Sequence, residues 1–144
     1  KAGEVAQLAD LVHSVDSLKL ARRLSAISLE RGRRLPILVQ VNTSGEGAKS
    51  GLAGEGALEA IHQMLELGGV EVRGLMTMAP FVEDEGVVRR AFAALRRVQE
   101  EARGLPGYQG RELSMGMTND FELAVEEGST MVRLGTALFG ERPR

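Results

Sequence analysis

The sequence predicts an α/β fold built on a parallel sheet, and three observations support this class. Short apolar runs rich in β-branched residues alternate with segments of helical periodicity, which is the pattern of strands joined by crossover helices. The runs are apolar on both faces, as strands covered by helices must be. No linker-like or low-complexity segment divides the chain, so we expect a single domain over residues 1–144.

A polar amino-terminal segment of helical character, "KAGEVAQLAD", precedes five expected strands. The strands are residues 10–16 ("DLVHSVD"), 36–42 ("PILVQVN"), 70–78 ("VEVRGLMTM"), 112–118 ("ELSMGMT") and 130–135 ("TMVRLG"). Crossovers between parallel strands should be right-handed.

Helices are expected in the four intervals between these strands. The predicted start signals are Asp16 or Ser17 for the first helix, the acidic run 83–85 for the third, and Thr118 or Asn119 for the fourth. Their expected inward residues are Leu20, Leu24, Ile27; Leu58, Ile61, Leu65; Val88, Ala91, Phe92, Leu95, Val98, Ala102; and Phe121, Ala124, Val125. Glycines after each stripe, from Gly32 to Gly128, should end the helices.

Two architectures fit this order of elements, an open doubly wound sheet and part of a (β/α)8 barrel. A complete barrel takes about 250 residues, and five strands cannot close one. From the residues alone, the open sheet is favoured.

Composition excludes several classes of function. A net charge of −2 provides no basic field for nucleic acid or anionic lipid, and the arginine pairs, interspersed with acids, favour a solvated surface. The absence of cysteine excludes disulfides and thiolate zinc sites and fits a cytoplasmic setting. The two histidines are too isolated to indicate a metal site. No apolar run approaches the roughly 18 residues of a membrane span.

The glycine-rich loop after the second strand, "VNTSGEGAKSGLAGEG", is not a nucleotide motif. It contains Lys49–Ser50, but Thr43 and Ala48 stand where a P-loop requires glycine. No third glycine completes a dinucleotide fingerprint after Gly45 and Gly47. A flexible surface loop is the favoured interpretation.

The last two strand-to-helix corners are the best candidates for a site, because ligands of parallel α/β folds lie beyond the carboxyl ends of the strands. Ser114, Gly116 and Thr118 end the fourth strand, and Gly135 and Thr136 end the fifth. Hydroxyls and helix amino termini at adjacent corners could bind a phosphate. Tight turns and helix caps explain the same residues, and spacing alone does not decide between the two.

Two polar residues fall within the predicted strands. Arg133 alternates with Met131 and Gly135 on a face that should be buried, so it needs an anion, an acceptor ligand or an ion pair with Asp120 or Glu122. His13 lies mid-strand, where a hydrogen-bonded core histidine is a more common finding than a catalyst.

Four blocks, "LVHSVDSLKLA", "VQVNTSGEGAKSGL", "VRGLMTMAP" and "LSMGMTNDFELAVEEGSTMVRLGTALFG", together resemble the pyridoxal phosphate homeostasis proteins. The last block is the most specific, and "VRLGTALFG" is also similar to the cofactor barrel of alanine racemases. The resemblance implies a (β/α)8 barrel, so the five strands would be strands four to eight, and it overrules the open sheet. It implies a cytoplasmic, non-catalytic protein of cofactor homeostasis, with pyridoxal 5′-phosphate and cofactor-accepting enzymes as partners and a monomeric full-length parent.

By the same resemblance, Ser114, Gly116, Thr118, Gly135 and Thr136 should surround the cofactor phosphate, through hydroxyls and backbone amides. Arg133 should face the pyridine nitrogen, where a cation disfavours protonation of the ring and weakens it as an electron sink.

The resemblance also implies that the lysine that binds the cofactor covalently lies on the first barrel strand, before Lys1. The chain is therefore expected to be the carboxyl-terminal five-eighths of a barrel, with no catalytic residue of its own and with unpaired sheet edges that promote aggregation. A racemase-like enzyme is the alternative; such enzymes use a lysine and a tyrosine as bases, and the single tyrosine, Tyr108, lies in a turn away from the expected site. A barrel that binds another phosphate, such as a sugar phosphate, also fits the corners.

Overall fold

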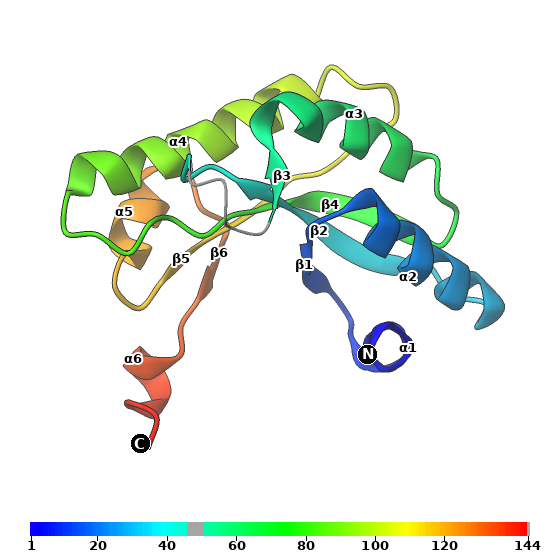
Figure 1. Ribbon diagram of the computed structural model, residues 1–144, viewed down its shortest axis with the longest axis horizontal. Coiled ribbons are helices and arrows are strands. Elements are labelled where there is room, and N and C mark those ends of the chain that lie inside the picture. The colour runs from blue at the N-terminus through cyan, green and yellow to red at the C-terminus, as the bar shows by residue number, and fades with distance from the viewer. Residues whose placement is uncertain (46–50, 144) are drawn as a thin grey trace.

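The computed structural model describes residues 1–45 and 51–143, which form a six-stranded parallel sheet with helices around it (Figure 1). The elements in chain order are α1 (Ala2–Leu8), β1 (Val12–Val15), α2 (Leu18–Glu30), β2 (Leu35–Asn42), β3 (Leu52–Ala53), α3 (Gly54–Leu65), β4 (Val70–Met76), α4 (Glu85–Ala102), β5 (Glu112–Met117), α5 (Phe121–Glu126), β6 (Met131–Arg133) and α6 (Thr136–Phe139). Each predicted strand is present, and the short strand β3 was not predicted.

The strand order shows that the sheet is an arc of a barrel. The main path runs β1-β2-β4-β5-β6, and β3 pairs with β2. Neighbours therefore follow chain order, whereas a doubly wound sheet reverses its order at a switch point. Helices α2, α3, α4 and α5 lie along one side of the sheet, and α1 and α6 extend to the other side at its two ends (Figure 1). The open doubly wound sheet is thus wrong, and the partial (β/α)8 architecture implied by the resemblance is confirmed.

A hydrogen bond across the sheet shows how strongly it curves. Strands β2 and β4 separate β1 from β5, so a flat sheet would hold β1 and β5 about 14 Å apart. His13 Nδ1 on β1 nevertheless lies 2.8 Å from Ser114 Oγ on β5. Two side chains of this length can meet only if the sheet bends and both point to its concave side.

The core lies between the sheet and the outer helices, as the helical periodicity predicts. Of the expected inward residues, those that are fully or almost fully buried are Leu24, Ile61, Val88, Ala91, Phe92, Leu95, Ala102 and Ala124. The prediction for Val125 is wrong, because its side chain is 56% exposed. Helix α5 has only 6 residues, so a narrow stripe around Ala124 suffices to attach it to the sheet.

Two of the predicted helix starts are confirmed and one is wrong. Ser17 Oγ accepts a hydrogen bond from Leu20 N at 3.1 Å, and Asp84 Oδ1 accepts one from Gly86 N at 2.9 Å. Helix α5 begins after Asp120 rather than after Thr118 or Asn119. The Asp120 carboxylate instead accepts from Met117 N at 2.8 Å and closes the turn that follows β5.

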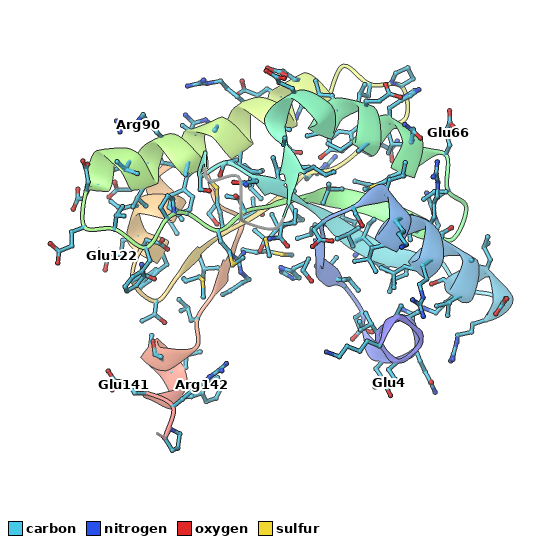
Figure 2. The ribbon with its side chains drawn as sticks, viewed as in Figure 1. Glu4, Glu66, Arg90, Glu122, Glu141 and Arg142 are labelled. Atoms are coloured by element: carbon cyan, nitrogen blue, oxygen red, sulfur yellow. The ribbon has the colours of Figure 1, made fainter. Side chains whose placement is uncertain are left out.

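Charged residues cover the outside of the fold. Figure 2 shows the labelled side chains of Glu66, directly after α3, and of Arg90, on α4, pointing away from the sheet, and both are exposed. In residues 1–45 and 51–143, no helix combines the length and the apolar character needed to cross a bilayer. The same residues contain no group of three or more His, Asp or Glu side chains placed to hold a metal ion.

The 144-residue chain is expected to self-associate. Among the described strands, β6 pairs on one side only and β1 ends the sheet at the other edge, and such edges accept strands from other copies. Large apolar side chains are also exposed nearby, including Phe139 at 85% and Leu138 at 68%. Sedimentation velocity should show dimers or larger species at micromolar concentration. A monodisperse monomer with a sharp cooperative melt would contradict this expectation.

Candidate functional site

The candidate site lies at the carboxyl-terminal edge of β4, β5 and β6. Arg133 is the last residue of β6, Ser114 lies in β5, and Thr77 directly follows β4. Because the strands are parallel neighbours, their carboxyl ends meet at one edge, where ligands bind in folds of this class.

The Arg133 guanidinium is held at both ends by neighbouring strands. Nη1 donates to Ser114 Oγ at 2.6 Å, and Nη2 donates to the Thr77 carbonyl oxygen at 2.9 Å. Burial lowers the pKa of Arg133, while the Asp120 carboxylate raises it. Within the described part of the chain, Arg133 forms no ion pair with a carboxylate. The predicted ion pair with Asp120 or Glu122 is therefore absent there, and the guanidinium keeps capacity for a ligand.

His13 joins this group from the far side of the arc. Its Nδ1 lies 2.8 Å from the same Ser114 Oγ, so one hydroxyl links His13 and Arg133. His13 is hydrogen-bonded, as expected, but it is only half-buried rather than a core residue, and its partner belongs to the candidate site. Burial, and next the positive charge of Arg133, lower the pKa of His13 below its ordinary value of 6.5.

This shift predicts how pH affects folding stability. The unfolded chain binds a proton at His13 more tightly than the folded chain, so stability should fall as the pH drops through about 6.5. Comparison of urea midpoints at about pH 8 and about pH 5.5 should show a larger loss for the wild type than for His13→Asn. Equal losses in the two proteins would show that His13 does not contribute.

The corner after β6 presents backbone donors without acceptors. In the described residues, the amides of Gly135 and Thr136 make no hydrogen bond, and both residues are exposed. The next amide, Ala137 N, donates to Thr118 Oγ1 at 3.1 Å. The Thr118 hydroxyl therefore accepts one bond and keeps its proton for another partner.

Gly116 has a conformational role at this edge. Its φ is +104°, and a Cβ there would lie 2.7 Å from Ala124 Cβ and 3.0 Å from Phe121 Cα. Only glycine fits this backbone shape and this close approach of β5 to α5. Gly116 thus sets the path of the chain into the turn that carries Thr118.

A pocket of about 390 Å³ opens beside Arg133. Its lining residues are Gln40, Val41, Asn42, Thr77, Met78, Ala79, Phe81, Gly116, Met117, Asn119, Asp120 and Arg133. Thr118 lines the adjoining pocket over α5, and Ser114 is fully buried behind Arg133. Gly116 and Arg133 therefore line this pocket and Thr118 the adjoining one, whereas Ser114 contacts Arg133, and Gly135 and Thr136 line neither pocket.

Thr77 is a site residue that sequence reasoning missed. Its hydroxyl donates to the Val41 carbonyl oxygen at 2.7 Å and lies 2.8 Å from Thr43 Oγ1, while its own carbonyl binds Arg133. A polar residue directly after a buried strand, as in "GLMT", is the signal that could have identified it. Lys49–Ser50 of the glycine-rich loop lie outside the described residues.

Comparisons with known proteins agree with this fold. The family described as "Alanine racemase, N-terminal domain" matches residues 1–143. The Pyridoxal phosphate homeostasis protein of Aquifex aeolicus is 41% identical over 132 residues, which cover 92% of this chain and 58% of that protein. The protein of the same name from Vibrio cholerae is 41% identical over 139 residues, covering 96% of this chain and 58% of that protein. The chain thus spans about 58% of the length of these relatives.

A solved structure extends the comparison to a ligand. The structure of PipY of Synechococcus elongatus with PLP bound superposes with a TM-score of 0.88 at 37% sequence identity. The match covers 97% of this chain and 65% of that protein.

Proposed function

Because the chain belongs to the family of the alanine racemase N-terminal domain, we propose that it binds pyridoxal 5′-phosphate at the edge formed by β4, β5 and β6. The pyridoxal phosphate homeostasis proteins that it resembles, and PipY with PLP bound, support this ligand. The observation that carries the proposal is the pair of amides at Gly135 and Thr136, which have no partner among the described residues and closely follow Arg133, whose guanidinium lines the pocket.

The donor set at the corner fits a phosphomonoester. Gly135 and Thr136 offer two amides that are free within the described part of the chain, and Thr118 offers a hydroxyl proton. Amides and hydroxyls at a turn bind phosphate oxygens without needing a lysine. We assign Thr118, Gly135 and Thr136 to the phosphate, with Gly116 shaping the turn.

Arg133 fits the ring end of the ligand. A guanidinium donates hydrogen bonds but cannot accept them, so it suits an unprotonated pyridine nitrogen. When bound, the cofactor supplies an electron-accepting ring, and a cation at the ring nitrogen limits that capacity. This supports a role in holding or transferring the cofactor inside the cell, without turnover.

The five main strands correspond, in this proposal, to strands four to eight of a barrel. The chain's share of its relatives' length agrees with that placement. The covalent lysine is then expected on the first strand of the full barrel, and none is assigned here.

The position of Tyr108 argues against a racemase-like activity that uses a tyrosine base. Its side chain is buried, its hydroxyl donates to Gln99 Oε1, and burial raises its pKa. Tyr108 also precedes β5, so it lies toward the amino-terminal edge of the sheet, opposite the site. It therefore cannot serve as a base at the ligand.

Thr118→Val is expected to weaken binding of pyridoxal 5′-phosphate about tenfold, since a hydrogen bond to a charged phosphate is lost while side-chain volume is kept. Calorimetric titration measures the affinity. Binding of pyridoxal, which lacks the phosphate, should be unchanged by the substitution.

Thr130→Val is the matched control. Thr130 Oγ1 accepts from Leu113 N at 2.8 Å at the start of β6, away from the site, so this variant should lose stability but not affinity. Unchanged affinity of Thr118→Val, or equal affinity of the wild type for the two ligands, would refute the phosphate assignment.

A further inference from the structure

Ser114 has a side chain whose single proton can be assigned. Its Oγ is fully buried between Arg133 Nη1 at 2.6 Å and His13 Nδ1 at 2.8 Å. Arg133 can only donate, so Ser114 Oγ accepts from it. In the described residues, the only acceptor within reach of the Ser114 proton is His13 Nδ1.

This assignment fixes the tautomer of His13. If Nδ1 carried a proton, the buried Ser114 hydroxyl would have no acceptor, and a buried donor without an acceptor destabilises the fold. Nδ1 therefore accepts, and the ring proton is on Nε2. The hydrogen bonds run in one direction, from Arg133 to Ser114 and from Ser114 to His13.

We infer that His13 is a positioning residue for Arg133, which it holds through the Ser114 hydroxyl in the orientation that meets the ligand ring. With Nη2 held by the Thr77 carbonyl and Nη1 held by Ser114, the planar fork has one orientation. Ser114 has no proton left for a phosphate oxygen, so it belongs to the ring end of the site. The identity of the ligand in this inference rests on the proposed function. The hydrogen bonds from Arg133 to Ser114 and from Ser114 to His13 do not depend on it.

The hydrogen bonds that link Arg133, Ser114 and His13 can be tested in the protein without bound cofactor. Nitrogen NMR of the histidine rings should show His13 with an unprotonated Nδ1 and a protonated Nε2 at neutral pH. Ser114→Ala should shift the His13 Nδ1 resonance, and His62, which lies on α3, is the internal control. A protonated Nδ1, or no shift in Ser114→Ala, would overturn the inference whether or not any cofactor binds.

The effect on the ring can be isolated with two ligands, pyridoxal 5′-phosphate and its 1-deaza analogue, in which a C–H replaces the ring nitrogen. His13→Leu should lower the affinity for pyridoxal 5′-phosphate about fivefold, since the hydrogen bond from Ser114 to His13, which orients Ser114 and through it Arg133, is lost. The affinity for the deaza analogue should not change, because a C–H accepts no bond from Arg133. His13→Asn, whose amide oxygen can accept from Ser114, should restore most of the lost affinity.

The outcomes separate the two proposals. An equal loss for both ligands would show a merely structural role for His13, and no loss for either would show no role; each overturns the inference. Absence of binding to the wild type would instead refute the proposed function and leave the NMR test standing. If His13→Leu does not fold, the Ser114→Ala variant carries the same comparison of the two ligands.

Discussion

Replacing Gly74 with alanine is expected to cause a large loss of folding stability. Gly74 has a φ of +156°, and a Cβ there would lie 2.0 Å from the carbonyl oxygen of Glu112 on the neighbouring strand. The obstacle is backbone at the centre of the sheet, where β4 pairs with β5, so neither strand can move away without losing ladder hydrogen bonds. We expect a loss on the order of 4 kcal/mol in the free energy of unfolding, out of the roughly 5–15 kcal/mol typical of a domain.

Urea denaturation followed by circular dichroism measures this loss. Gly56→Ala is the matched control, because Gly56 lies in helix α3 and no atom lies within 4 Å of an added Cβ. That variant should gain about 0.5–1 kcal/mol from higher helix propensity. Equal midpoints for Gly74→Ala and the wild type would show that β4 and β5 are not packed as closely as described.

Arg133→Ala is expected to have the largest effect on ligand binding. Under the proposed function it removes the guanidinium that meets the ring, and it leaves the buried Ser114 hydroxyl and the Thr77 carbonyl without their donor. A charge-assisted hydrogen bond contributes about 1.5–3 kcal/mol, so the affinity for pyridoxal 5′-phosphate should fall by between about 10- and 100-fold. Arg133→Lys should recover only part of this, because a lysine keeps the charge but not the planar fork.

The control for Arg133 is Arg90→Ala. Arg90 lies on the outer face of α4, pointing away from the sheet (Figure 2), so its removal changes the net charge equally but should leave the affinity unchanged. Calorimetric titration measures all three variants, after thermal melts confirm that they are folded. An affinity of Arg133→Ala equal to that of Arg90→Ala would contradict the placement of the ring.

Local elements were predictable because their signals are local. Leu24 and Phe92 follow the helical period and are buried, and Ser17 and Asp84 have side chains that can cap a helix. The distinction between a barrel arc and an open sheet was not predictable from periodicity. The same alternation of strands and helices occurs whether helices cover one face of a sheet or both, and the resemblance decided it.

The candidate site was predictable in its location but not in its contacts. The rule that ligands lie at strand ends pointed to Thr118 and the corner at Gly135, and the burial expected of the last strand pointed to Arg133. The link from His13 to Ser114 joins residues 101 positions apart in the sequence, and it depends on the curvature of the sheet. No local pattern encodes that curvature, so Ser114 was assigned by analogy to the phosphate although its hydroxyl lies behind Arg133.

The bond between His13 and Ser114 has a consequence for how this protein tolerates mutation. That bond forms only at a particular curvature of the sheet. The curvature of the sheet and the orientation of the Arg133 guanidinium therefore change together. Substitutions far from the ligand that flatten the arc, even slightly, should therefore reduce recognition before they reduce folding. Natural variation in the outer helices would then be limited by ligand affinity as much as by packing.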